Sequence, residues 1–248
     1  MSERSFSEWL RRQCEPEWTA VVTHPFAMAI TTGAAAGDDM RRYLEQDFQF
    51  VDSFTALLGA AVASADTFEA RVPYGQFLGQ VATTEEKTYF HRALAELGGR
   101  TDAAPEPVTA AFQQLMAEVR AGQDYLLIAT VLCVAEWCYL GWASRAVEPL
   151  PESFVHREWI ELHEGAEFRS WVAFLRGELD RLGAALGEER RQEVLQVFRR
   201  TVELERAFFD VAAAWVSRAR PPGRRTSGSA APSCRAPARP PRSAAGRR

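Results

Sequence analysis

Hydrophobic positions along this chain recur every three to four residues, in long segments without the alternation that is typical of β-strands. Between residues 25 and 217 these segments are rich in Ala, Leu, Glu and Arg, which favour helix. Glycine and proline predict the helix breaks, at Gly37-Asp38, near Pro73, at Gly98-Gly99, at Gly122, from Pro149 to Pro151 and from Gly183 to Gly187. About eight helices remain between these breaks. The pattern predicts an all-α fold, with several helices long enough for a bundle.

An acid occupies the inward phase of the apolar stripe in three of these segments. Asp47 does so between Met40 and Leu58, and Glu205 does so near the end of the chain, between Val202 and Phe208. Glu136 is the only charged residue between Tyr125 and Ser144. A buried carboxylate without a partner is costly, so each of these acids needs either an ion pair or a wet pocket.

The segment around Glu136 is long enough to suggest a membrane span. The central acid, the lack of a flanking basic cluster and the absence of a second such segment argue against one. We therefore interpret this segment as a buried core helix. The two segments with Asp47 and Glu205 are interpreted in the same way, as helices whose inward faces carry one acid each.

Aromatic residues lie one helical turn after each inward acid: Phe50 after Asp47, Tyr139 after Glu136, and Phe208 after Glu205. A fourth long helix, with Trp159 and Trp171 on its stripe, places His163 on a core face, where it could equally be a satisfied core histidine. One inward acid is more often a stripe-edge residue paired with Arg. Three of them favour a pocket for a planar, nitrogen-rich ligand, with carboxyls of raised pKa.

Composition divides the chain into residues 1–217 and a tail of residues 218–248. The tail is rich in Pro, Ser, Ala, Gly and Arg, lacks periodicity and is predicted to be disordered. It holds nine Arg and no acid, so residues 1–217 have 20 basic and 33 acidic residues, a net charge of −13. That acidity argues against nucleic acid or an anionic membrane as the main partner. The basic tail could touch RNA, DNA or the acidic body, but it is typical of a composition-biased extension.

The cysteines show neither metal-site nor disulfide spacing, and Cys133 and Cys138 lie within an apolar helix. Without an apolar signal region after Met1, the expected location is the reducing cytoplasm. No GxGxxG, P-loop or GxSxG motif occurs, so dinucleotide, nucleoside-triphosphate and elbow-serine chemistries have no support.

A helical bundle with inward acids and histidines could instead hold two irons. The repeated Glu-x-x-His of di-iron proteins is missing from this sequence. A non-standard set could be assembled from Glu86, His91, Glu136, His163, Glu167 and Glu205. A non-haem di-iron oxidase is therefore the alternative function, and a non-catalytic module that binds the planar ligand is another.

Six sequence blocks occur in the order that is typical of one known family. They are HPF at 24–26, YLEQDFQF at 43–50, EEKTYFHRALAEL at 85–97, VAEWCY at 134–139, WIELHEGAEF at 159–168 and ELERAFFDVA at 203–212. Over residues 5–217 the chain resembles the TenA family, also called thiaminase II or aminopyrimidine aminohydrolase. The resemblance implies the haem-oxygenase-like all-helical fold, without implying haem.

The resemblance also implies roles for the site residues. Asp47 would hold the edge of an aminopyrimidine ring, Phe50 and Tyr139 would border the ring, and Glu205 would be the catalytic acid or base. The better known branch has a nucleophilic Cys in the block that here reads VAEWCY, whereas this chain has Ala135 followed by Glu136, like the branch labelled TenA-E. Phe50 and His163 stand where the Cys branch tends to have Tyr, and Phe112 completes the predicted substrate-binding residues.

These departures favour hydrolysis of thiamin breakdown products over cleavage of thiamin. The predicted reaction releases the amine or formylamine from a 4-amino-5-aminomethyl-2-methylpyrimidine and leaves the hydroxymethylpyrimidine. Glu205 and Glu136 divide the proton transfer and the activation of the nucleophile, in either order. Neither cofactor nor metal is expected. The resemblance implies a homo-oligomer, a dimer or tetramer, and Trp142 is predicted to be an exposed aromatic suited to its interface.

Overall fold

The computed structural model describes residues 5–219, without the side chains of residues 84–87 and 213–219. The regular elements of the described chain are all helices, with no strand among them, as the sequence predicts. Its elements are α1 (Phe6–Gln13), α2 (Glu17–Val22), α3 (Pro25–Thr31), α4 (Gly37–Phe48), α5 (Phe50–Ser64), α6 (Phe68–Gln80), the π-helical segment η1 (Val81–Phe90), α7 (His91–Leu97), α8 (Pro107–Gly122), α9 (Tyr125–Ala143), α10 (Phe154–Glu164), α11 (Ala166–Gly183) and α12 (Glu188–Ala219). The predicted disordered tail lies outside the described residues, except that α12 extends through Ala219.

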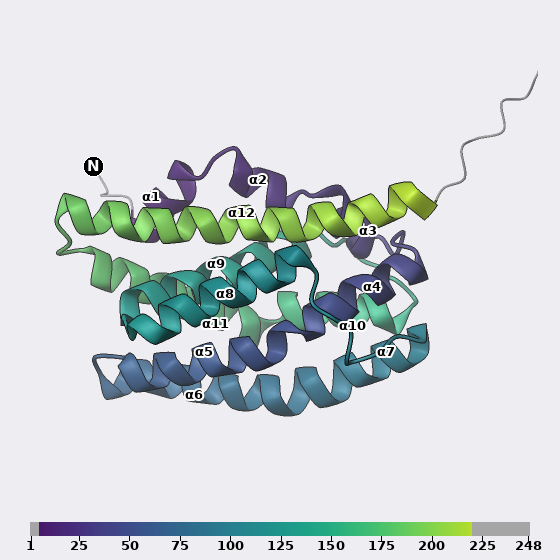
Figure 1. Cartoon of the computed structure of the whole chain (residues 1–248), viewed down its shortest axis with the longest axis horizontal. Helices are drawn as coiled ribbons and strands as arrows, with labels where there is room; N and C mark the ends of the chain where they lie inside the picture. The colour runs from purple at the N-terminus through teal and green to yellow at the C-terminus, as the bar shows by residue number, and fades with distance from the viewer. Residues whose placement is uncertain (1–4, 220–248) are drawn as a thin grey trace, which may run out of the picture.

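The long helices form a bundle around α9. In Figure 1, α12 runs along one side and the α5/α6 pair along the opposite side, with α8, α9 and α11 between them. Helix α9 packs most extensively against α11 and α12 and also contacts α5, α8 and α10. This central position confirms the interpretation of the apolar segment as a core helix.

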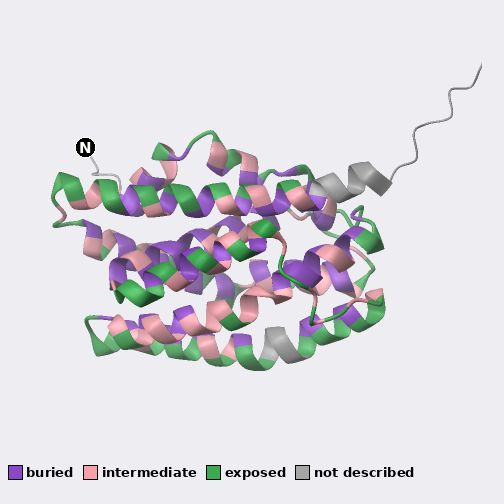
Figure 2. Ribbon diagram, in the orientation of Figure 1, coloured by how far each residue is buried: buried purple, intermediate pink, exposed green. Residues whose placement is uncertain are grey.

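Helix α9 is the one helix of the described chain that is long and apolar enough to cross a membrane by length and composition. Within the fold, however, 67% of its apolar window is buried by the surrounding helices. Burial in protein accounts for its apolar composition, because a helix covered on all sides needs no polar face. Figure 2 shows the same concentration of buried positions on the inner helices of the bundle.

Several predicted helix ends agree with the structure. Gly98, with φ of +66°, follows the end of α7, and α8 ends at Gly122. No break occurs at Pro73, which lies inside α6. The turn comes earlier, at Thr67, whose hydroxyl accepts a hydrogen bond from the Ala70 N–H at 3.1 Å and caps α6.

Two predicted long helices are each split into two. The segment from Met40 to Leu58 breaks at Gln49, between α4 and α5, and the fourth segment breaks at Gly165, between α10 and α11. The break at Gln49 is held by two tertiary hydrogen bonds that sequence periodicity does not register. The Gln113 amide of α8 donates to the Gln49 carbonyl at 2.7 Å, and the Gln49 amide donates to the Thr101 carbonyl at 3.0 Å.

Candidate active site

One cavity of about 90 Å³ lies within the bundle and is lined by every residue that the sequence proposes for the site. The lining residues come from seven elements: Asp47, Phe50, Val51, Phe54, Val81, Phe90, Phe112, Met116, Ala135, Glu136, Tyr139, Trp159, His163 and Glu205. The three helix faces that each carry one inward acid therefore converge on this cavity, which helical periodicity alone does not establish.

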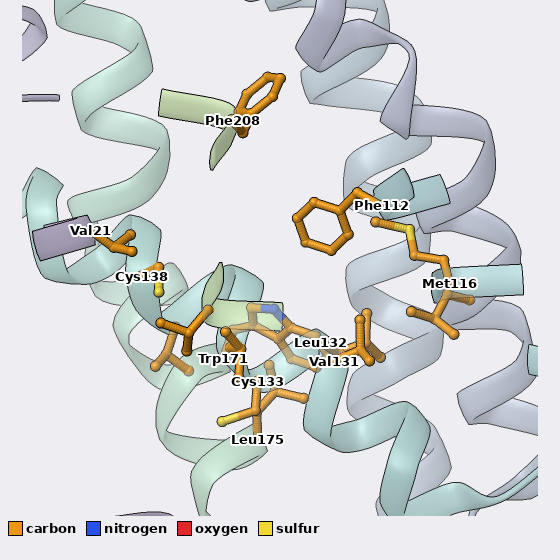
Figure 3. Packing of buried hydrophobic residues seen from close by; sticks show 14 of the residues in the cluster. Val21, Phe112, Met116, Val131, Leu132, Cys133, Cys138, Trp171, Leu175 and Phe208 are labelled. Carbon is orange, nitrogen blue, oxygen red and sulfur yellow. The ribbon is translucent and has the colours of Figure 1, made fainter. Parts of the chain in front are cut away.

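The break at Gln49 determines how α4 and α5 present their residues. Asp47 lies in the last turn of α4 and Phe50 begins α5, and both side chains line the cavity. Phe50 packs edge-to-face on Phe112, with ring centroids 5.3 Å apart, and on Phe208, at 5.1 Å. Phe112 and Met116 of α8, both in the cavity wall, are shown close up in Figure 3. The cavity thus combines an acid at its edge with flat apolar walls.

Glu205 is the most deeply buried of the three acids, with 2% of its surface exposed. No side chain of the described residues donates a hydrogen bond to it. Desolvation raises the pKa of Glu205 well above its usual value, and the nearby charge of Asp47 raises it further. This shift favours the protonated form of Glu205, the form that a general acid needs.

Glu136 and Tyr139 lie three residues apart on α9 and so share the face that lines the cavity. The Tyr139 hydroxyl donates a hydrogen bond to Asp47 Oδ1 at 3.1 Å. Burial raises the pKa of Tyr139, with a further contribution from Asp47, so its hydroxyl keeps its proton. Tyr139 is consequently a hydrogen-bond donor as well as a wall.

His163 is a neutral imidazole in this environment. Its Nδ1 lies 2.8 Å from the Trp159 carbonyl oxygen, which can only accept, so Nδ1 carries the ring proton. Burial lowers the pKa of His163 to about 4. At neutral pH the Nε2 atom therefore has a lone pair and acts as an acceptor. The ring packs against Tyr139, with centroids 4.9 Å apart, so His163 belongs to the aromatic wall.

Sequence reasoning missed several wall residues. Trp159 was placed on an apolar stripe but not in the site, and Phe54, Phe90 and Met116 carried no signal beyond hydrophobic spacing. Tyr43 precedes Asp47 by one turn, and its hydroxyl lies 2.9 Å from that of Tyr139. A hydroxyl on the inward phase beside an inward acid is the signal that could have identified Tyr43.

Trp142 is a correction, because the sequence analysis expects it to be exposed. It is fully buried, beside Tyr139 and His163, because neighbouring helices cover this face of α9 as well. The large apolar residues that are exposed in the described chain are Phe68, Val72 and Val147.

The alternative metal set is not assembled by the described side chains, among which no three His, Cys, Asp or Glu form a group able to hold a metal ion. His91 and Glu167 are exposed, and the side chain of Glu86 lies outside the described residues. The break at Gly165 places Glu167 on a different helix from His163. The described residues therefore give the di-iron oxidase no specific support.

The cysteines of α9 are poor candidates for a nucleophile. Cys133 and Cys138 are fully buried and do not line the cavity, and Figure 3 shows both sulfurs among apolar side chains of the core. Burial raises the pKa of both thiols well above the usual value. Because the thiolate is the reactive form, both are expected to be inert.

A model of the TENA/THI-4/PQQC family matches residues 11–214. The chain is 24% identical over 214 residues to the aminopyrimidine aminohydrolase of Helicobacter pylori, with 83% of this chain and 97% of that protein covered. It is 21% identical to the thiamine biosynthesis multifunctional protein ThiED of Corynebacterium efficiens, covering 75% of this chain. The chain spans about a quarter of the length of that protein, with 25% covered.

Among solved structures, a TenA homologue from Pyrococcus furiosus superposes with a TM-score of 0.76 at 21% identity, covering 84% of this chain and 99% of that one. At this identity the likeness concerns the fold, which is the haem-oxygenase-like helical bundle that the sequence analysis expects.

Proposed function

Since this chain belongs to the TENA/THI-4/PQQC family, we propose that it is a hydrolase of thiamin salvage that acts on aminopyrimidines. The substrate is a 4-amino-5-aminomethyl-2-methylpyrimidine or its formylamine, and the pyrimidine product is the hydroxymethylpyrimidine. The name of the Helicobacter pylori relative, which is matched over almost its full length, supports this class of reaction.

The observation that carries the proposal is the pairing of unlike carboxyls in one aromatic cavity. Burial and the charge of Asp47 raise the pKa of Glu205, while Asp47 accepts a hydrogen bond from Tyr139. Two acids in one site that differ in protonation can perform different tasks at the same pH. Phe50, Phe112, Tyr139 and His163 supply walls for a planar ring.

In the proposed reaction, a water oxygen bonds to the exocyclic methylene carbon as the carbon–nitrogen bond breaks. The leaving nitrogen takes a proton from Glu205, and Glu136 accepts a proton from the attacking water. The products are the hydroxymethylpyrimidine and ammonia, or formamide from the formylamine. Asp47 holds the amino edge of the ring during both steps. Exchange of the roles of Glu136 and Glu205 gives the same overall balance.

In the block where the resemblance implies a nucleophilic cysteine for the better known branch, this chain offers Glu136 for the same task. A carboxylate can activate or orient water, and the two nearby thiols are buried away from the cavity. This favours direct hydrolysis of an amine over a route through a thiolate adduct.

The test is a turnover assay of the full chain with thiamin, the aminomethylpyrimidine and its formylamine, each followed by chromatography of the pyrimidine product. We expect the hydroxymethylpyrimidine from one or both amines and little product from thiamin. Binding without turnover would instead favour a non-catalytic module. Elemental analysis of protein purified without chelator serves as the companion measurement, because about two irons per chain would favour the oxidase. The homo-oligomer and the cytoplasmic location stay predictions.

A further inference from the structure

Three hydrogen bonds run from an indole in the cavity wall, through a fully buried tyrosine outside the cavity, to the acid proposed to hold the substrate. The Trp159 indole N–H donates to the Tyr43 hydroxyl at 3.3 Å, the hydroxyls of Tyr43 and Tyr139 lie 2.9 Å apart, and Tyr139 donates to Asp47 Oδ1 at 3.1 Å. Tyr43 does not line the cavity and has no exposed surface. We call these residues the donor chain.

The direction of the donor chain is fixed at its indole end. An indole N–H can only donate, so the Tyr43 oxygen accepts from Trp159. Each hydroxyl has one proton, and the Tyr43 proton therefore points to the Tyr139 oxygen. The Tyr139 proton is then directed to Asp47 Oδ1. The reverse direction would leave the buried Tyr43 proton facing the indole N–H, and an unsatisfied buried donor is costly.

We propose that Trp159 and Tyr43, acting through Tyr139, hold Asp47 Oδ1 as an obligate acceptor and thereby make the site select 4-aminopyrimidines over 4-oxopyrimidines. Tyr43 is a positioning residue, since it acts on the substrate through Tyr139 and Asp47. This inference rests on the proposed function, because it assigns the ring edge to Asp47. It adds a determinant of specificity that lies outside the cavity.

The chemistry of the ring edge explains the selection. An acceptor oxygen attracts the N–H of a 4-amino group and repels the lone pairs of a 4-oxo group. Any proton carried by Asp47 resides on Oδ2 while the donor chain is intact. Without Tyr43 as a donor, the Tyr139 oxygen can accept a hydrogen bond from a protonated Oδ1. Asp47 Oδ1 is then no longer fixed as an acceptor, so it no longer discriminates between the amino and the oxo ligand.

Asp47 is surrounded by other groups that can titrate. Tyr139 and Glu136 approach the cavity from α9, His163 from α10 and Glu205 from α12, while the charge of Asp47 also acts on Tyr89 of η1. For this reason the proposed readout is a ratio of affinities for two ligands at one pH. The ratio cancels effects that change both ligands equally.

The experiment compares wild type with Tyr43→Phe by calorimetric titration with 4-amino-5-hydroxymethyl-2-methylpyrimidine and with its 4-oxo counterpart. The Tyr43→Phe variant should bind the amino ligand about five- to tenfold more weakly, the range typical of one lost hydrogen bond. Its affinity for the oxo ligand should change by less than about twofold. In steady-state kinetics the loss should fall on KM, with kcat within about twofold of wild type.

Tyr89→Phe is the matched control. Tyr89 is equally buried, stacks on Trp159 with ring centroids 4.8 Å apart, and donates one hydrogen bond to the Val155 carbonyl at 2.6 Å. Tyr89→Phe also removes one hydroxyl beside the Trp159 indole, but this hydroxyl lies outside the donor chain. This variant should retain the wild-type ratio of affinities.

A double variant tests the connection itself. If Tyr43 acts through Tyr139, adding Tyr43→Phe to Tyr139→Phe should weaken amino-ligand binding by no more than about twofold, because the chain is already broken. Full additivity of the two effects would overturn the proposal. If Tyr43→Phe does not fold, Trp159→Phe removes the first donor, and an unchanged ratio in that variant would overturn the proposal equally.

Failure of this inference can be distinguished from failure of the proposed function. A wild-type protein that neither binds the amino ligand nor turns over the aminomethylpyrimidine overturns the function and this inference with it. A wild-type protein that does both, together with a Tyr43→Phe variant of unchanged affinity ratio, overturns only the donor chain.

Discussion

Two buried glutamates in different parts of the bundle have pKa values that are shifted in opposite directions. Glu178 of α11 is 8% exposed and Glu205 of α12 is 2% exposed, so both have lost most of their hydration. Desolvation pushes the pKa of Glu178 upward, but hydrogen bonds from Arg181 and Tyr125 outweigh it and lower the pKa. Desolvation raises the pKa of Glu205, and Asp47 adds to that effect.

This comparison indicates that the hydrogen-bond donors and charges around a buried acid, more than its burial, decide whether the acid is charged or protonated. Arg181 donates to Glu178 at 2.7 and 2.9 Å and also reaches Asp66, while the Tyr125 hydroxyl donates to Glu178 at 2.5 Å. Glu178 is thus fixed as an anion in a structural ion pair. Glu205 faces a cavity beside another acid, which keeps its proton available for transfer.

The largest expected effect is on turnover, in Glu205→Gln. The amide keeps the shape but cannot transfer a proton, so kcat for the aminomethylpyrimidine should fall on the order of 10²–10⁴. Glu136→Gln should lose activity to a similar extent. Steady-state kinetics beside thermal melts provide the measurement. Wild-type kinetics in both variants would make these acids structural.

The stability of Glu205→Gln should change in the opposite sense to its activity. Because the pKa of Glu205 is raised in the folded state, its charged form is less stable there than in the unfolded chain, and this costs stability at neutral pH. Replacement by Gln removes that cost and should leave the melting temperature equal or higher. The raised pKa of Glu205 lowers the stability only at pH values above the pKa of this group in the unfolded chain. The stability gained by Glu205→Gln should therefore vanish below about pH 4.

The next effect is on ligand affinity, in Asp47→Asn. This change removes the charge that accepts from Tyr139 and, in the proposed function, the acceptor for the ring edge. Binding of the hydroxymethylpyrimidine should weaken about ten- to a hundredfold, as is typical when a hydrogen bond to a charged group is lost. Calorimetric titration measures it. Unchanged affinity would remove Asp47 from the substrate site.

A smaller effect is expected on stability alone, in Glu178→Gln. The ion pair with the half-exposed Arg181 is weakened, which should cost about 1–2 kcal/mol in the free energy of unfolding without changing kcat. The lowered pKa of Glu178 implies stabilisation that is present above the unfolded value and lost as the pH falls through the folded value. Denaturation at pH 7 and pH 3 measures it, with a smaller difference expected at pH 3.

No effect is expected at the thiols of α9. Cys133 and Cys138 are fully buried and have raised pKa values, so iodoacetamide on the folded protein should leave turnover unchanged. Mass spectrometry of modified peptides beside the assay checks this. Stoichiometric inactivation at either thiol, prevented by the pyrimidine, would restore a cysteine nucleophile.

Particular residues show which features of the site could be predicted from the sequence. The inward phases of Asp47, Glu136 and Glu205 follow from the helical period, and all three line the cavity. The period could not register the breaks at Gln49 and Gly165, because a helix interrupted by one residue keeps almost the same stripe. Nor could it place Trp142, since a helix that is apolar all round does not reveal which of its faces is covered.

The sequence alone determined the all-α class, the acids on the inward phase and the resemblance to one family, because each depends on the order and spacing of residues. Only the tertiary structure decided which buried acid has an arginine partner and which faces a cavity. It also decided that Tyr43, Tyr139 and Asp47 lie in hydrogen-bond contact across α4 and α9. Those properties depend on distances between helices, and the period of one helix contains no information about its neighbours.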